Sequence, residues 1–345
     1  MDLPANLIYT TDRDPGFSRR GAGTGFAYYD PTGTLLPDGE IKERLKSLAL
    51  PPAYHDVWYC AEENGHLQAT GLDDRDRKQY RYHEDWSAWR NAQKFAGLAD
   101  FGHALPSLRG KVNRCLKGSG LGKERVVAAV IKLLDRTAIR IGNEVYYEEN
   151  GTCGLTTLRE DNVEVDGDGH LELEFTAKGG EEREFTLYQP RLAKIIDKLE
   201  DLPGQRLFTY KDGENLHPVD SSDVNNALEE LTGKRFTAKD FRTWRASQLT
   251  LAHLAFQPQV ESQRELIAQE KEALKATSSQ LGHRPPVCRK HYVHPRILEL
   301  HRAGTLQSWA AKTKDIKAPG GLNKDEQRLL QFLAEEAPSS SFSAI

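Results

Sequence analysis

The sequence predicts an α+β protein with a small β-rich N-terminal domain and a larger, mainly α-helical domain that contains a short antiparallel β insert. Short β-branched or aromatic runs separated by Gly, Pro, Asn and Asp fill the first part of the chain. Longer runs follow, with apolar residues spaced three and four apart, and one group of alternating segments interrupts them. The 345 residues fit two domains, 1–90 and 91–337, with a tail over 338–345 that we expect to be disordered.

In the first domain, the runs between turn residues predict strands. The expected strands are Gly25–Asp30, Asp56–Ala61, His66–Gly71 and Lys78–Tyr82. One segment differs, because Ile41, Leu45 and Leu48 share one helical face and predict a helix over Glu40–Leu48.

In the second domain, a helix is predicted over Lys123–Arg136. Its apolar residues recur at helical spacing and are Val126, Val127, Val130, Leu133 and Leu134. The β insert is expected to contain the strands Thr152–Leu158, Val163–Val165, Leu171–Phe175 and Arg183–Leu187, with a hairpin turn at Asp166-Gly-Asp-Gly169. Further helices are expected over Gln189–Leu199, Ser221–Leu231, Thr237–Phe256, Val260–Thr277, Pro295–Arg302 and Lys324–Glu336.

Composition argues against several classes of protein. The mean hydropathy of -0.64 and the lack of a long apolar run argue against a membrane-spanning segment, so we expect no membrane association. Residues 1–14 lack the apolar core of a secretory signal, which favours the cytoplasm. The four cysteines form no C-x-x-C pair, and we expect them to be reduced thiols.

Basic residues are clustered although the net charge is -4. Residues 1–90 carry the acidic excess, whereas Ala104–Arg125 and Leu281–Arg302 are rich in Lys, Arg and His. Two basic clusters on an otherwise neutral region predict a local track for phosphates. The alternative is an ordinary solvated surface.

Two motifs that could hold a ligand do not fit their patterns. Lys117-Gly-Ser-Gly-Leu-Gly-Lys123 has three residues between Gly118 and Gly122, and Glu124 follows the lysine, so it is not a nucleotide-binding P-loop. The histidines near residue 290 are not joined by Cys or paired carboxylates at the spacing of metal ligands. We therefore expect no cofactor and no metal.

Basic and aromatic residues are interleaved over Arg75–His83. On a strand, Gln79 and Arg81 share one face, while Tyr80 and Tyr82 share the other. Such side chains can contact base edges and the DNA backbone together. The simpler interpretation is an exposed edge strand.

Four further segments carry residues suited to phosphate chemistry. Arg140 precedes an expected turn at Gly142, and Lys178 lies beside two glycines at an expected hairpin tip. Lys239 and Arg242 follow a capping box that begins at Thr237. His283 precedes Tyr292 by nine residues. Each residue alone fits a structural role, but the ordered set is far less expected by chance.

Taken together, these segments resemble the type IB DNA topoisomerases, particularly the compact bacterial enzymes similar to the poxvirus enzyme. In the first domain, the matching motifs are Arg19-Arg-Gly-Ala-Gly-Thr-Gly-Phe26, Leu50-Pro-Pro-Ala53, Asn64-Gly-His-Leu-Gln-Ala-Thr-Gly71 and Arg77-Lys-Gln-Tyr-Arg-Tyr-His83. In the second domain, they are Ile139-Arg-Ile-Gly-Asn143, Lys239-Asp-Phe-Arg-Thr243 and Cys288-Arg-Lys-His-Tyr-Val-His-Pro295.

The resemblance implies a site and a reaction. Tyr292 is the implied nucleophile, and the residues around the phosphate are Arg140, Lys178, Arg242 and His283. Position 283 is His or Asn in the family, and this chain has His. The implied reaction relaxes supercoiled duplex DNA through a 3′-phosphotyrosyl intermediate, without ATP or metal. The expected DNA-binding residues are Gln79, Tyr80, Arg81, Tyr82, Lys239, Arg289 and Lys290.

The chemistry of these side chains agrees with that role. Transesterification at a phosphodiester requires a nucleophile, stabilisation of the oxygens and an acid for the leaving group. Two arginines can bracket non-bridging oxygens with fixed geometry, and a lysine crowded by cations has a lowered pKa. The expected partner is double-stranded DNA, bound by a cytoplasmic, nucleoid-associated monomer.

Two rivals remain on sequence alone. A tyrosine recombinase shares the Arg–Lys–Arg–His–Tyr set, but it usually has His-x-x-Arg where this chain has Lys239-x-x-Arg242, and it lacks the β-rich domain. A non-catalytic DNA-architectural protein would use Tyr292 only for packing.

Overall fold

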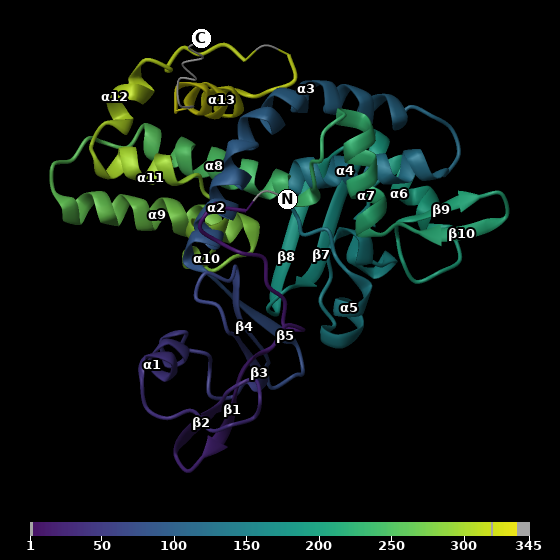
Figure 1. Ribbon diagram of the computed structural model, residues 1–345. Coiled ribbons are helices and arrows are strands. Elements are labelled where there is room, and N and C mark those ends of the chain that lie inside the picture. Colours follow the sequence, from purple (N-terminus) through teal and green to yellow (C-terminus); the bar gives the residue numbers. More distant parts are fainter. Residues whose placement is uncertain (1–2, 319, 337–345) are drawn as a thin grey trace, which may run out of the picture. The chain divides into compact units, whose positions relative to one another are not determined.

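The computed structural model describes residues 3–318 and 320–336 of the chain. Two compact units, Met1–Ala96 and Gly97–Ile345, make up the molecule. The first is rich in strands and the second is mainly helical with small antiparallel sheets, which confirms the predicted fold class (Figure 1). The tail expected to be disordered, residues 338–345, lies outside the described residues.

A five-stranded antiparallel sheet with the order β2-β1-β3-β4-β5 forms the centre of the first unit. Its strands are β1 (Gly16–Ala22), β2 (Gly25–Tyr29), β3 (His55–Cys60), β4 (Leu67–Leu72) and β5 (Lys78–Tyr82). Strand β1 is not expected from its composition, because Phe17 is its only buried side chain and no alternation is visible. The other four strands match the predicted ones to within a few residues.

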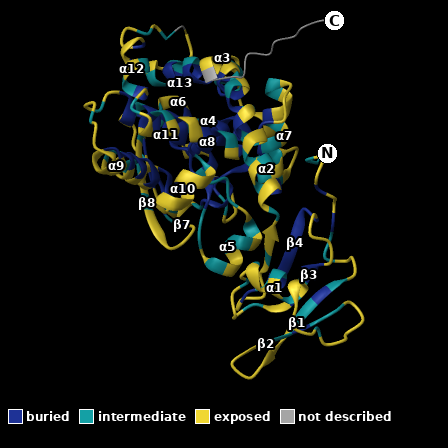
Figure 2. Cartoon of the chain, turned by 60° about the vertical axis from the view of Figure 1, so that its left-hand side comes forward, coloured by how far each residue is buried: buried dark blue, intermediate teal, exposed yellow. Residues whose placement is uncertain are grey.

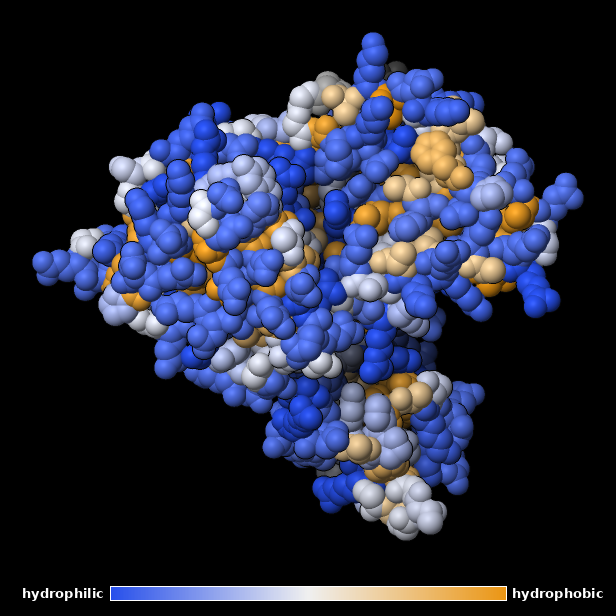
Figure 3. All heavy atoms as spheres, turned by 180° about the vertical axis from the view of Figure 1, so that it is seen from behind, coloured by the Kyte–Doolittle hydropathy of each residue, from blue (hydrophilic) through white to orange (hydrophobic). Residues whose placement is uncertain are grey.

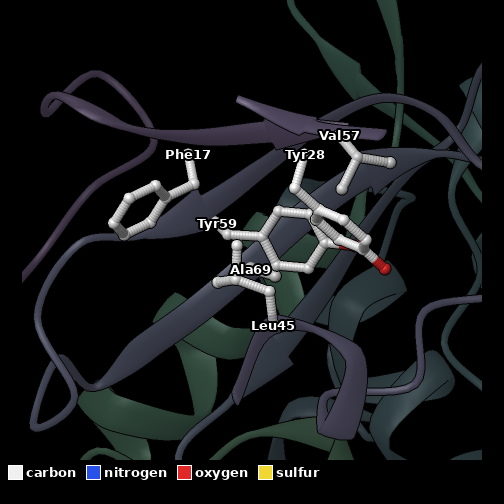
Figure 4. Packing of buried hydrophobic residues seen from close by; sticks show 6 residues of the cluster. All are labelled: Phe17, Tyr28, Leu45, Val57, Tyr59 and Ala69. Atoms are coloured by element: carbon white, nitrogen blue, oxygen red, sulfur yellow. The ribbon is translucent and has the colours of Figure 1, made fainter. Parts of the chain in front are cut away.

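The core of the first unit lies between this sheet and α1 (Glu40–Ser47). Figure 4 shows the rings of Tyr28 and Tyr59 beside Leu45, with Phe17 farther along the same layer. Leu45 is 1% exposed, whereas Ile41 of the same predicted helical face is 48% exposed. Helix α1 is therefore anchored by a narrower apolar stripe than expected. Helix α2 (Glu84–Ala96) completes the unit.

The second unit is a bundle of helices. These are α3 (Leu98–Cys115), α4 (Lys123–Thr137), α5 (Glu144–Asn150), α6 (Pro190–Glu200), α7 (Ser221–Thr232), α8 (Ala238–Ala255), α9 (Gln263–Leu281), α10 (Pro285–His291), α11 (Pro295–Arg302), α12 (Leu306–Ala311) and α13 (Lys324–Glu336). Helices α8, α9 and α11 lie side by side, and α13 packs against α3 and α8 (Figure 1). The long helices α4 and α8 each contain more buried residues than any other helix of the bundle (Figure 2).

The predicted core helix is confirmed as α4. Its expected apolar residues are at most 2% exposed, and they are Val126, Val127, Val130, Leu133 and Leu134. Burying such a side chain contributes roughly 1.5–3 kcal/mol. Ala138 follows the last residue of α4 and has φ 52°, a left-handed conformation that turns the chain out of the helix.

The β insert is a three-stranded sheet with the order β6-β7-β8. Its strands are β6 (Val163–Val165), β7 (His170–Ala177) and β8 (Glu181–Tyr188), and a separate hairpin is formed by β9 (Thr209–Asp212) and β10 (Asn215–Pro218). The prediction of a strand over Thr152–Leu158 is wrong. That segment forms a 3₁₀ turn over Leu155–Thr157 and a single bridge between Cys153 and Ala177, because its backbone pairs with the chain around Arg140.

Hydrophilic side chains cover most of the surface that Figure 3 shows, with smaller apolar patches between them. Within residues 3–318 and 320–336, no helix combines the length and the apolar character needed to cross a bilayer.

Candidate active site

Four of the expected site residues meet at one place in the helical unit. Arg140 follows α4, Arg242 lies on α8, His283 follows the end of α9, and Tyr292 directly follows α10. Short contacts between side-chain nitrogens and a contact between rings link them directly. Residues up to 152 positions apart in sequence thus form one cluster.

The turn that carries Arg140 is fixed by the chain around Gly154. The amide groups of Leu155 and Thr156 donate to the carbonyl oxygens of Arg140 and Ile141, at 2.9 and 2.7 Å. A Cβ at Gly154 would lie 2.5 Å from Gly142, so the close approach requires glycine. Gly142 itself has φ 97°, as expected for a turn glycine. The contact between these two segments sets the direction in which Arg140 leaves the turn.

Arg242 is held inside the protein, with 4% of its surface exposed. Its guanidinium donates to the carbonyl oxygen of Leu281 at 2.7 Å and to that of Ala138. Burial and the charge of Arg140 lower the pKa of Arg242. The predicted capping box is present at the start of α8, where the backbone amide of Thr237 donates to the Asp240 carboxylate at 2.7 Å.

His283 lies between the two arginines. Its Nδ1 is 3.0 Å from a terminal nitrogen of Arg140, and its Nε2 is 2.6 Å from one of Arg242. Burial, and then the charges of Arg242 and Arg140, lower the pKa of His283 to about 3. The ring is therefore neutral at pH 7 and has one N–H donor and one acceptor nitrogen. Since a guanidinium only donates, one of the two contacts is not a hydrogen bond, and the ring N–H finds no acceptor on either arginine.

Tyr292 packs its ring against His283. The ring centroids are 4.3 Å apart with an interplanar angle of 25°, and the Arg242 guanidinium carbon lies 5.6 Å from the centre of the tyrosine ring. The backbone of Tyr292 is positioned by Ser247 of α8, which is fully buried. Ser247 Oγ donates to the Tyr292 carbonyl oxygen at 3.2 Å and accepts from the His294 amide at 3.0 Å.

Lys178 lies apart from these four residues, in the turn between β7 and β8. Gly179 and Gly180, with φ 95° and 76°, make this tight turn possible. The Lys178 ammonium is 4.5 Å from the centre of the Tyr146 ring. A cavity of about 390 Å³ is lined by Lys178, Arg140 and Tyr146 among others. Lys178 therefore faces the same cavity as Arg140 without joining the His283 cluster.

The expected DNA-binding residues of the first unit lie on β5. Tyr80 and Tyr82 stack with ring centroids 6.1 Å apart and are 53% and 41% exposed. Arg81 is exposed, whereas Gln79 donates to the Asp73 carboxylate at 2.9 Å. The two tyrosines thus form an exposed aromatic surface, whereas the side-chain amide of Gln79 is bound to Asp73.

The expected DNA-binding residues of the second unit lie on two helices, α8 and α10. Lys239 is exposed on the first turn of α8, and Lys290 is exposed on α10. Arg289 forms an ion pair with Glu270, at 3.2 Å, and Glu270 is almost fully buried. Within the described residues, no group of three or more His, Cys, Asp and Glu residues is arranged to hold a metal ion.

Sequence reasoning does not identify two residues that contact the candidate site. Ser247 fixes the backbone of Tyr292, and Tyr146 lies under the ammonium of Lys178. Ser247 follows Lys239-Asp-Phe-Arg-Thr243 on the same helix, so helical spacing offers a weak signal. Tyr146 follows Arg140 by six residues and carries no such signal.

The site as a whole brings together groups that are suited to phosphate chemistry. Two guanidinium groups, a neutral imidazole and a phenol converge, and an ammonium faces the adjoining cavity. This combination supplies donors for phosphate oxygens and a hydroxyl for attack on phosphorus.

Comparison with known proteins gives the family. Residues 83–317, more than half of the chain, match the model described as eukaryotic DNA topoisomerase I, catalytic core. Residues 25–73 match the model described as bacterial DNA topoisomerase IB, N-terminal domain. The chain belongs to the type IB DNA topoisomerase family.

Individual relatives agree with this assignment. The chain is 31% identical to DNA topoisomerase 1B of Acanthamoeba polyphaga mimivirus over 295 residues, which covers 83% of this chain and 88% of the relative. It is 25% identical to DNA topoisomerase 1B of vaccinia virus strain Copenhagen, over 83% of this chain and 89% of the relative. The expected function as a DNA topoisomerase of type IB, acting on DNA, is thereby confirmed over the recombinase and architectural rivals.

Proposed function

We propose that this topoisomerase relaxes duplex DNA with Tyr292 as its nucleophile and Arg140, Arg242, His283 and Lys178 as the groups that act on the phosphate. The observation that carries the proposal is the position of His283, which stacks on Tyr292 and lies between both arginines. A phosphate beside this ring would be within reach of donors from three side chains and of the phenol.

Cleavage follows from these positions. The Tyr292 oxygen attacks the phosphorus, the bond from phosphorus to the 5′-oxygen breaks, and a 3′-phosphotyrosyl ester forms. The phenolic proton leaves to solvent, and Lys178 gives a proton to the departing 5′-oxygen. The two arginines neutralise the non-bridging oxygens, and the His283 N–H donates to one of them.

Resealing reverses each step. The free 5′-hydroxyl end rotates about the intact strand, attacks the phosphotyrosyl ester and returns its proton to Lys178. Since the ester retains the energy of the phosphodiester, the cycle requires no nucleotide hydrolysis. A phenol, whose pKa is about 10, is a suitable leaving group for this step.

DNA is bound, in this proposal, by both units. Tyr80, Tyr82 and Arg81 of β5 contact one part of the duplex, and Lys239 and Lys290 contact phosphates near Tyr292. Gln79 and Arg289, which are engaged with Asp73 and Glu270, exchange these partners for DNA. We further propose that the enzyme acts as a monomer in the cytoplasm, associated with the nucleoid.

Trapping a covalent adduct tests the central step. The full chain is mixed with supercoiled plasmid or a labelled duplex, and detergent is added to stop resealing. The proposal predicts label attached to the protein at Tyr292. Labelling at another residue, or relaxation without any adduct, would overturn it.

A further inference from the structure

The C-terminal end of α9 is held by arginine side chains. The last carbonyl groups of a helix lack partners within the helix and carry a partial negative charge. Here the Leu281 carbonyl accepts from Arg242 and the Gly282 carbonyl accepts from Arg140, both at 2.7 Å. The two arginines proposed to bind phosphate are thus bound to the backbone that leads directly into His283.

A third arginine, Arg183 of β8, holds the two preceding carbonyls. Its Nη1 donates to the Ser279 oxygen and its Nη2 to the Gln280 oxygen, each at 2.5 Å. The planar guanidinium therefore bridges two successive residues of the last turn of α9. Since both terminal nitrogens already donate to backbone oxygens, Arg183 is poorly placed to bind DNA phosphate as well.

The position of Arg183 connects two parts of the site. It lies five residues after Lys178 along the chain, on the strand that leaves the lysine turn. A Cβ built on Gly282 would lie 3.6 Å from the side chain of Arg183 and 3.6 Å from that of Arg140. Gly282 adopts φ 60°, so the chain turns sharply between the held carbonyls and His283. A shift of the α9 end would move the imidazole directly.

We propose that Arg183 is a positioning residue for transesterification: by binding the Ser279 and Gln280 carbonyls, it places His283 against Tyr292 and ties the strand after Lys178 to the end of α9. This inference rests on the proposed function of Tyr292. With Arg183 in place, the end of α9 does not depend on Arg140 and Arg242 alone, and these two can turn donors toward a phosphate.

The test compares Arg183→Ala and Arg183→Lys in the full chain, with Arg136→Ala as the matched control. Arg136 lines the same cavity of about 400 Å³ as Arg183 but is exposed at the end of α4. Single-turnover cleavage of a duplex is measured with saturating enzyme, well below each variant's melting temperature. Non-covalent DNA affinity is measured separately with each substitution in a Tyr292→Phe background.

Arg183→Ala should cleave about 10²-fold more slowly with unchanged DNA affinity, because displacement of a reacting group by about 1 Å has an effect of that size. Arg183→Lys should have an intermediate rate, since an ammonium keeps the charge but lacks the planar pair of N–H donors with which the guanidinium binds two carbonyl oxygens. Arg136→Ala should cleave at the parent rate.

Several results would overturn the inference. These are a parent-like rate for Arg183→Ala, a loss of affinity that accounts for the whole loss of rate, or an equal defect in Arg136→Ala. If Arg183→Ala does not fold, the Arg183→Lys variant provides the test, provided that it folds. Slower cleavage by Arg183→Lys at unchanged DNA affinity supports the positioning role, and cleavage at the parent rate refutes that role. Failure of the proposed function is distinguishable, because Tyr292→Phe alone would then still form an adduct.

Discussion

The imidazole of His283 lies flat against the phenol of Tyr292, with ring centroids 4.3 Å apart and an angle of 25° between the rings. This contact joins the ends of two helices, α9 and α10, and places Tyr292, the proposed nucleophile, beside a side chain that two arginines also reach. Because the ring is neutral at pH 7, it can pack against the phenol and still offer one N–H to an oxygen.

Removing the phenolic oxygen should abolish cleavage without removing DNA binding. Tyr292→Phe keeps the ring that stacks on His283, so the site should retain its shape. Gel shift with a duplex should give parent-like affinity, and detergent trapping should give no adduct. Residual relaxation in a preparation free of host enzyme would redirect the assignment to Tyr80 or Tyr82.

Replacing His283 should separate hydrogen bonding from proton transfer. His283→Ala removes one donor to a non-bridging oxygen and should slow single-turnover cleavage about 10²–10³-fold. His283→Asn retains an N–H donor and should keep much of the activity. If the Asn variant were as slow as the Ala variant, a proton-transfer role for His283 would be the better explanation.

The buried neutral state of His283 should make stability depend on pH. The pKa of His283 is about 3 in the folded protein and 6.5 for an unperturbed side chain, so the unfolded chain binds more protons at this position between these values. Acidification from pH 6.5 toward 3 therefore favours unfolding through this residue. As the pH is lowered over this range, the melting temperature of His283→Asn should decrease less than that of the parent protein. Parallel decreases in the two proteins would show that His283 does not titrate in this way.

Binding to duplex DNA should weaken steeply with salt despite the net charge of -4, because contacts with phosphates release counterions. Removing one phosphate contact with Lys290→Ala should reduce the slope of log affinity against log salt by about 1. Arg235→Ala is the control, since this exposed arginine pairs with Glu229. A parent slope near zero would contradict the local phosphate track.

The fold and the site differ in how much the sequence reveals. Short motifs around Arg140, Arg242 and Tyr292 identify the residues that meet, because each motif is local and its spacing is characteristic. Helix α4 is equally visible, since its buried positions repeat at helical spacing. These features depend on neighbours within a few residues.

Features that depend on distant backbone groups are not visible in the sequence. The Thr152–Leu158 segment alternates like a strand, but its amide groups pair with the turn at Arg140. Arg183 resembles any charged residue on a strand, yet its partners are carbonyl groups 96 and 97 residues away. No side-chain pattern encodes a contact with a backbone oxygen, so positioning residues of this kind appear only in the structure.

Lys178 should be the acid that protonates the departing 5′-oxygen, and a change of leaving group can test this role. An alkoxide resembles hydroxide, whose conjugate acid has a pKa of about 15.7, and leaves poorly without a proton. Lys178→Ala should therefore cleave ordinary DNA roughly 10²–10⁴-fold more slowly. A thiolate, whose conjugate acid has a pKa of about 8.5, leaves without such help. On DNA with sulfur at the bridging 5′ position, the variant should regain nearly the parent rate.

The arginines provide the matched controls for this experiment. Arg140→Ala and Arg242→Ala should remain slow on both substrates, because they stabilise the non-bridging oxygens, which the sulfur substitution leaves unchanged. The position of Lys178 makes the experiment necessary, since its ammonium lies 4.5 Å from the Tyr146 ring and shares only a cavity with Arg140. If sulfur does not rescue Lys178→Ala, the lysine positions DNA. The acid must then be sought in Lys239, Arg242 or a water molecule.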